Sequence, residues 1–261
     1  MNETSVRSFA SMSPEMDNGV GPLGRIGLIV LSSDDVAEDS FKRILPDDLV
    51  ACFTSRIPFP DAGTPDALLA MAEHLTGAAA TILPENRIDL LAYSCTSGAA
   101  AIGEQKIAEL LQKARPGVAC TNPLTAATAA FEKLGARRVA VLTPYPEAIH
   151  RQVIERILDR GFDVTETLSF DLHRDSDIGR VTPAAIRQAV RRMNLARADA
   201  VFVSCTLLRA LETIEPVEAE VGVPLVTSIQ AMAWHALGLL RYDRAIEGFG
   251  QLLRQRWQLE Q

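Results

Sequence analysis

Short, almost wholly apolar runs recur along the chain, and amphipathic segments separate them. The runs are RIGLIVL, IDLLAYS, GVACT, RRVAVLT, ADAVFVS and VGVPLVTS. Because these runs lack polar alternation, they predict short strands buried on both faces. The longer segments have apolar residues at helical spacing and predict helices over residues 64–83, 97–114, 122–135, 146–161, 183–196 and 229–240. Alternating strands and helices predict an α/β fold with parallel sheets.

The order of these segments repeats after about 110 residues. RIGLIVL matches RRVAVLT, IDLLAYS matches ADAVFVS, and GVACT matches VGVPLVTS. A repeat of this length indicates a duplicated domain. We therefore expect two pseudo-symmetric Rossmann-like (flavodoxin-like) domains with the active site in the cleft between them. The predicted division is a disordered tail over 1–21, a first domain over 22–121 plus 229–261, and a second domain over 122–228.

Two Ser-Cys-Thr triplets end equivalent strands of this repeat, at Cys95 and Cys205. Ligands of open α/β sheets bind outside the carboxyl ends of the strands, so both thiols are expected in one cleft. A thiolate and a thiol on opposite faces of a small substrate can perform nucleophilic or acid–base catalysis without a metal or nucleotide cofactor. The backbone amides that follow each cysteine are expected to lower its pKa and to bind a substrate carboxylate.

Polar side chains at the neighbouring strand ends are the candidates to bind that carboxylate. They are Ser32, Ser33, Thr96, Ser97, Thr121, Asn122, Tyr145, Thr206 and Ser228. Helix capping is the alternative role for several of them. Capping is the expected role of Asp34, because an ionised Asp would repel an anionic substrate. His235, on a helix face, is expected to be structural.

Composition narrows the class of protein further. The 261 residues are 48% hydrophobic with a net charge of −7, which allows a sizeable core. Lysine and arginine are scattered, so nucleic acid is not an expected partner. No apolar run approaches the ~20 residues of a membrane helix. The four cysteines show no metal-binding spacing, and without a signal sequence they predict reduced thiols in the cytoplasm.

The segments YSCTSGAAAIGE, LTPY, FVSCTLLRA and TSIQAMAWHALGLL resemble the Asp/Glu racemase superfamily over residues 25–240. The most similar branch is the maleate cis–trans isomerase and ectoine-utilisation group, with arylmalonate decarboxylase as a relative. The resemblance implies a cofactor-independent enzyme, with homodimers or higher homo-oligomers common. In its racemases two thiols exchange the α-proton. In its maleate isomerases the thiolate matching Cys95 adds to the alkene and the cysteine matching Cys205 moves a proton. The decarboxylase keeps only the second cysteine.

The chain departs from the maleate isomerase pattern at acidic positions. Asp34 stands where the maleate isomerases carry an Asn, Asp171 stands where the ectoine-utilisation proteins commonly have one, and Ser228-Ile229-Gln230 replaces the Ser-Asn-Gln of the ectoine group. The added negative charge disfavours a dicarboxylate such as maleate, and the resemblance to the ectoine-like branch implies a small, amino-acid-derived carboxylate. We therefore predict a cofactor-independent isomerase or racemase of such a carboxylate. The alternatives are a decarboxylase of a malonate-type acid and a non-catalytic small-molecule binding protein.

Overall fold

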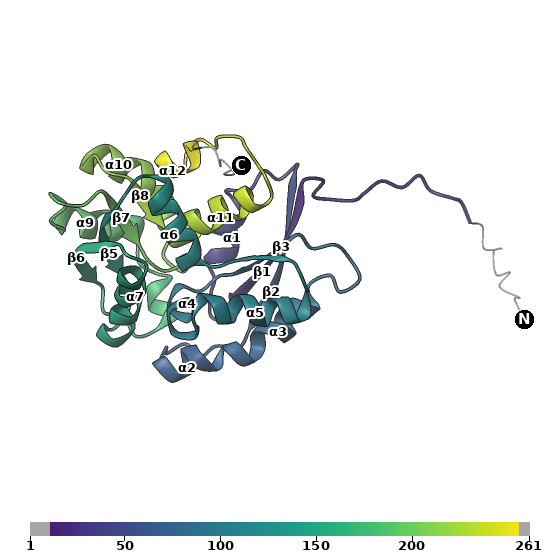
Figure 1. The fold of residues 1–261 in the computed structure, drawn as a ribbon, viewed down its shortest axis with the longest axis horizontal. Coiled ribbons are helices and arrows are strands. Elements are labelled where there is room, and N and C mark those ends of the chain that lie inside the picture. Colours follow the sequence, from purple (N-terminus) through teal and green to yellow (C-terminus); the bar gives the residue numbers. More distant parts are fainter. Residues whose placement is uncertain (1–10, 256–261) are drawn as a thin grey trace, which may run out of the picture.

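The computed structural model describes residues 11–255, which contain two four-stranded parallel sheets (Figure 1). The first contains β1 (Gly24–Leu31), β2 (Val50–Ile57), β3 (Leu90–Tyr93) and β4 (Ala119–Thr121). The second contains β5 (Arg138–Thr143), β6 (Asp163–Ser169), β7 (Ala200–Val203) and β8 (Leu225–Thr227). Their orders, β2-β1-β3-β4 and β6-β5-β7-β8, are equivalent under the repeat. The predicted fold of two pseudo-symmetric α/β halves is confirmed.

Helices connect successive strands in both halves. The first half contains α1 (Ala37–Lys42), α2 (Pro65–Ala70), α3 (Ala72–Thr81), α4 (Thr96–Ile102) and α5 (Glu104–Ala114), and α6 (Pro123–Lys133) leads to the second. The second contains α7 (Glu147–Asp159), α8 (Asp175–Ile178), α9 (Pro183–Arg192), α10 (Ile214–Val221), α11 (Ser228–Leu239) and α12 (Gly250–Arg254). No helix among the described residues is long and apolar enough to cross a membrane.

The central strands carry the core, whereas β2 and β6 lie at sheet edges. Every residue of β3 and β7 is buried, as the continuous apolar runs predicted. β2 and β6 are mostly half-exposed and contain polar residues, VACFTSRI and DVTETLS. Because an edge strand is buried less completely, these segments lack the apolar signature, and the sequence pattern did not single them out.

Two of the predicted helices are interrupted. The segment over 64–83 divides at Met71 into α2 and α3, and the segment over 97–114 divides at Gly103 into α4 and α5. Gly103 has φ of 90°, a conformation that glycine adopts without steric cost. The chain therefore changes direction there, and α4 remains a short helix directly behind Cys95. Nothing comparable in the sequence marks the break at Met71.

Helices α6 and α11 pack against each other between the two sheets (Figure 1). They follow β4 and β8, so the predicted domain boundaries at residues 121 and 228 fall immediately before them. That division into domains stays a prediction. Residues 11–20 are exposed and contain no helix or strand. The rest of the expected tail, residues 1–10, and residues 256–261 lie outside the described part of the chain.

Candidate active site

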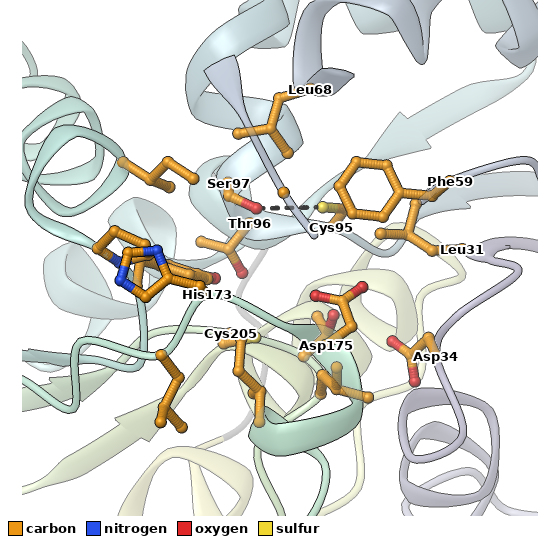
Figure 2. Close-up of a pocket in the computed structure, with 18 residues that line it drawn as sticks. Leu31, Asp34, Phe59, Leu68, Cys95, Thr96, Ser97, His173, Asp175 and Cys205 are labelled. Carbon is orange, nitrogen blue, oxygen red and sulfur yellow. Dashed lines mark hydrogen bonds between the residues drawn. The ribbon is translucent and has the colours of Figure 1, made fainter. Parts of the chain in front are cut away.

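A pocket opens at the carboxyl ends of the strands and is lined by both halves (Figure 2). The segments after β3 and β7 contribute Cys95 and Cys205, and the segment after β5 contributes Tyr145. Apolar side chains line much of the rest: Leu31, Phe59, Leu68, Ile149, Leu172, Ile178 and Leu207. The cavity volume is about 30 Å³, enough for one or two water molecules. The described conformation is therefore closed, and it must open to admit a carboxylic acid.

Cys95 caps the N-terminus of α4. Its Sγ accepts a hydrogen bond from the Gly98 N–H at 3.3 Å and lies 3.5 Å from Ser97 Oγ. A Cβ at position 98 would lie 2.2 Å from the Tyr93 hydroxyl, so glycine is required for this close approach. Burial raises the pKa of the Cys95 thiol to about 11, although Ser97 and the Gly98 amide lower it in part. The expectation of a lowered pKa is wrong for this closed state, because desolvation outweighs the amide dipoles.

Cys205 ends β7 in an unusual backbone conformation, with φ of 112°. A turn follows it at residues 206–207. Its backbone N–H donates a 2.9 Å hydrogen bond to Ser228 Oγ. Burial raises the pKa of this thiol above its usual range, and the Tyr145 hydroxyl and the Leu207 amide offset part of the effect. The expected pKa lowering therefore fails here too.

Tyr145 is 5% exposed and lines the pocket beside Cys205. Its hydroxyl meets no partner at hydrogen-bonding distance and angle, yet it lies close enough to lower the pKa of the Cys205 thiol. Burial and the two thiols raise the pKa of the phenol, which therefore stays protonated. A buried, unpaired phenol can donate a hydrogen bond to a bound carboxylate.

Asp175, the first residue of α8, and His173, two residues earlier, are polar pocket residues that the sequence analysis missed. The Asp175 carboxylate points into the pocket and lies close enough to act on both Cys95 and Cys205, whereas Asp34 lies at the margin (Figure 2). Ser33 Oγ donates a 2.5 Å hydrogen bond to it. Burial raises the pKa of Asp175 to about 6, and Asp34 and Asp61 raise it further while Ser33 lowers it.

Asp34 and Asp171, the two acidic departures from the family pattern, do not point toward the two thiols. Asp34 accepts hydrogen bonds from the backbone N–H groups of Val36 and Ala37 at the start of α1, as expected of a capping residue. Asp171 has φ of 54°, and its side chain is exposed. The sequence DLHRDSDIGR contains three aspartates within seven residues, and its spacing alone gives no reason to prefer Asp175.

The predicted carboxylate-binding residues divide by location. The pocket is lined by Thr96, Ser97, Tyr145 and Thr206. Ser33 lies behind Asp175, and Ser32 exchanges hydrogen bonds with the Phe59 backbone. Ser228 also lies behind the pocket, where its Oγ accepts from Thr96 Oγ1 and from the Cys205 amide.

Thr121 and Asn122 are not brought into this pocket. Thr121 Oγ1 lies 2.8 Å from His235 Nδ1 in the interior. Asn122 caps α6 by accepting from the N–H groups of Leu124 and Thr125. Helix capping by Asn122 and internal pairing of Thr121 with His235 therefore replace the substrate contacts that the sequence repeat predicted for these two residues. Burial lowers the pKa of His235 to about 4, so this ring is neutral near pH 7.

Two loops meet beside the pocket, one after β2 and one after β6. Asp61 accepts hydrogen bonds from Arg174 Nε at 2.7 Å and from the Ser176 backbone N–H at 2.8 Å. An isolated antiparallel bridge joins Ala62 to Arg174, and the Asp175 N–H donates to the Asp61 carbonyl at 2.8 Å. We call these contacts of residues 61–62 with 174–176 the clasp. Because Phe59 and Asp175 line the pocket, the clasp joins two of the loops that form its wall.

Fold and site together define a class: α/β proteins of two similar halves with one cysteine from each half in a shared pocket. The family model described as arylmalonate decarboxylase matches residues 73–253, and the chain belongs to this family. The resemblance to the Asp/Glu racemase superfamily and its maleate isomerase branch is confirmed. Among the described residues, no group of three or more His, Cys, Asp or Glu side chains is placed to hold a metal ion.

Relatives of two named activities match the chain. Maleate isomerase of Geobacillus stearothermophilus is 26% identical over 244 residues, covering 88% of this chain and 96% of the relative. Arylmalonate decarboxylase of Bordetella bronchiseptica is 30% identical over 139 residues, 52% of this chain and 58% of the relative. A structure of Nocardia farcinica maleate cis–trans isomerase, a cysteine-to-serine mutant with a covalently bound succinylcysteine intermediate, superimposes with a TM-score of 0.81 at 23% identity. It covers 88% of this chain and 98% of that one.

Proposed function

We propose that the protein is a cofactor-independent isomerase or racemase of a small carboxylate, with Cys95 and Cys205 as its catalytic pair. One observation carries the proposal: thiols at equivalent strand ends of two similar halves line the same small pocket. The maleate isomerase relatives support it, as does the succinylcysteine intermediate of the Nocardia farcinica enzyme. The ectoine-utilisation assignment, the cytoplasmic location and the homo-oligomeric state stay predictions.

The pair can perform two balanced reactions. In cis–trans isomerisation, the Cys95 thiolate forms a bond to one alkene carbon, and the alkene electron pair takes a proton from the Cys205 thiol at the other. The former alkene carbon–carbon bond is now single and can rotate. Reversal of both steps then restores the Cys95 thiolate and the Cys205 thiol. In racemisation, one thiolate removes the α-proton while the opposite thiol donates a proton to the other face.

The pocket supplies groups for a carboxylate and for thiolate formation. Tyr145 offers its unpaired hydroxyl, and Thr96 and Ser97 lie at the N-terminus of α4. The Gly98 amide stabilises a thiolate at Cys95, and the Leu207 amide with Tyr145 does so at Cys205. Since burial opposes ionisation of both thiols, thiolate formation requires a change in their surroundings, through opening of the pocket or through the charge of a bound substrate.

Decarboxylation is the second candidate. The family model and the partial match to arylmalonate decarboxylase favour it, and so does the largely apolar lining, which would assist loss of CO₂ from a malonate-type acid. If only Cys205 is needed to protonate the resulting carbanion, replacing Cys95 would leave this activity intact. A pure binding protein would show no turnover in any variant.

Proton NMR in D₂O with amino acids, hydroxy acids, malonates and cis-enedioates tests these readings. Exchange of an α-proton identifies racemisation, a cis-to-trans change identifies isomerisation, and loss of CO₂ identifies decarboxylation. We expect Cys95→Ala and Cys205→Ala each to lower turnover by about 10²–10⁴-fold. Cys120→Ala, outside the pocket, is the matched control and should retain activity. Full activity in both pocket variants would refute the proposal.

A further inference from the structure

The charges around the pocket are one-sided. Among its lining residues in the described chain there is no Lys or Arg, and His173 is the one basic residue, whereas Asp175 and Asp34 both contribute carboxyl groups. The nearby basic groups are directed elsewhere: Arg174 binds Asp61, Arg56 donates to the carbonyls of Leu31 and Asp34, and the largely exposed His173 lies 3.9 Å from Asp171. A second substrate carboxylate at the Asp175 end would therefore meet like charge with no Lys or Arg of the lining to offset it.

The same charges act on the thiols. The Asp175 carboxylate raises the pKa of both Cys95 and Cys205, yet the proposed chemistry needs one of them ionised. A positive group bound between Asp175 and the sulfurs would neutralise the carboxylate and favour a thiolate. The lining provides no Lys or Arg, and the exposed His173 faces Asp171, so a cationic substrate group is the source of positive charge that suits this position.

Other groups of the pocket fit an anion. The Tyr145 hydroxyl is buried beside Cys205 and forms no hydrogen bond of good geometry, and the start of α4 carries Thr96 and Ser97. The pocket thus presents hydrogen-bond donors from Tyr145 and the start of α4 together with the carboxylate acceptor of Asp175, with apolar side chains around them. This polarity matches a small zwitterion.

We propose that Asp175 determines specificity by binding the ammonium group of a small amino-carboxylate substrate. The assignment rests on the proposed function for its chemistry, but it concerns binding and can be measured without turnover. Ser33 positions Asp175 through its hydrogen bond and leaves the second carboxylate oxygen for the ligand.

The test compares matched ligand pairs that differ only in an ammonium replaced by a carboxylate. The pairs are racemic alanine with methylmalonate, β-alanine with succinate, and 4-aminobutanoate with glutarate. Dissociation constants are measured by ligand-observed NMR for the wild type, for Asp175→Asn and for Asp177→Asn. Asp177 lies on the same helix outside the pocket lining, which makes it the matched control.

In at least one pair we expect the wild type and the Asp177→Asn control to bind the ammonium compound at least about tenfold more tightly than its dicarboxylate counterpart. In Asp175→Asn this preference should largely disappear. The assignment is overturned if no ammonium member binds, if the dicarboxylates bind equally well or better in every pair, or if Asp175→Asn keeps the preference. The cysteine variants test the proposed function separately. If the ammonium preference is observed but the Cys95 and Cys205 variants stay fully active, the role of Asp175 stands and the catalytic pair is rejected.

Discussion

At the residue scale, the backbone of Cys205 is held in a conformation that side chains rarely adopt. Its φ of 112° costs a non-glycine residue about 1–3 kcal/mol. The surrounding structure maintains it, since the Cys205 N–H donates to Ser228 and the side chain is buried beside Tyr145. This arrangement aims the thiol into the pocket, although no helix follows to fix its direction.

That strain predicts a difference in stability between two substitutions of Cys205. Cys205→Gly and Cys205→Ala both remove the thiol, but only glycine adopts this φ freely. We expect Cys205→Gly to be about 1 kcal/mol more stable than Cys205→Ala in urea-induced unfolding. The same pair of changes at Cys120, which has no positive φ, should favour alanine. Equal stability of the two Cys205 variants would mean that the backbone relaxes at no cost.

Ionised Asp175 should lower the stability of the folded protein, and substitution of this residue should restore that stability. Its folded pKa of about 6 lies above the ordinary aspartate pKa of 3.8, so ionisation destabilises the folded state. Protonation removes the cost as pH falls toward 4, and the full cost is present above pH 6. Asp175→Asn should therefore raise stability by about 1–3 kcal/mol at pH 7, with the gain vanishing near pH 4.

Thermal unfolding across this pH range is the measurement, with Asp177→Asn as the control that should show little change. The groups that act on Asp175 are Ser33, Asp34, Asp61 and the two pocket thiols, and His173 also lines the pocket. Both thiols stay protonated below pH 7, so they add no titration in this window. A pH-independent difference between Asp175→Asn and the wild type would contradict the assignment of the shift to Asp175.

At the scale of elements, the degree of burial determines which strands can be predicted from the sequence. The fully buried β3 and β7 were evident from sequence, because every residue is apolar, and the repeat between them identified the cysteine pair. The polar edge strands β2 and β6 carry the loops that form the clasp. Their register and loop geometry decide that Asp175 points inward and Asp171 outward, and no local sequence pattern encodes that choice.

The clasp predicts how access to the thiols is controlled. Asp61→Ala removes the acceptor for Arg174 and Ser176, so the two loops should separate more often. We expect Cys95 to be alkylated by iodoacetamide about tenfold faster, because local opening precedes reaction. Mass spectrometry of the labelled site measures the rate. Asp66→Ala, at an exposed position on α2, should react like the wild type, and an unchanged rate in Asp61→Ala would show that the clasp does not limit entry.

At the scale of the whole molecule, hydrogen bonds join the two halves directly behind the pocket that contains Cys95 and Cys205. Ser228, at the start of α11, accepts hydrogen bonds from Thr96 of the first half and from the Cys205 amide of the second. Thr206 donates across the same junction to the Ser94 carbonyl. The relative position of the two thiols thus depends on contacts between the halves as well as on each half alone.

Loss of this junction should reduce stability and activity together. Ser228→Ala leaves the Cys205 N–H and the Thr96 hydroxyl without their acceptor, at a cost of about 1–3 kcal/mol. Ser94→Ala is the matched control, because its buried hydroxyl has no hydrogen-bond partner to lose. Chemical denaturation and turnover of both variants provide the comparison. Equal stability of Ser228→Ala and Ser94→Ala would contradict the proposed importance of the junction.

The closed cavity of about 30 Å³ also bears on how such a protein survives oxidants. Peroxide attacks the thiolate of an accessible cysteine, and here both sulfurs are buried and held as thiols. The resting protein is therefore shielded against sulfenic acid formation by the same closure that delays its substrate. The vulnerable moment is turnover itself, when the loops part and one sulfur ionises, so that oxidative inactivation would increase with use.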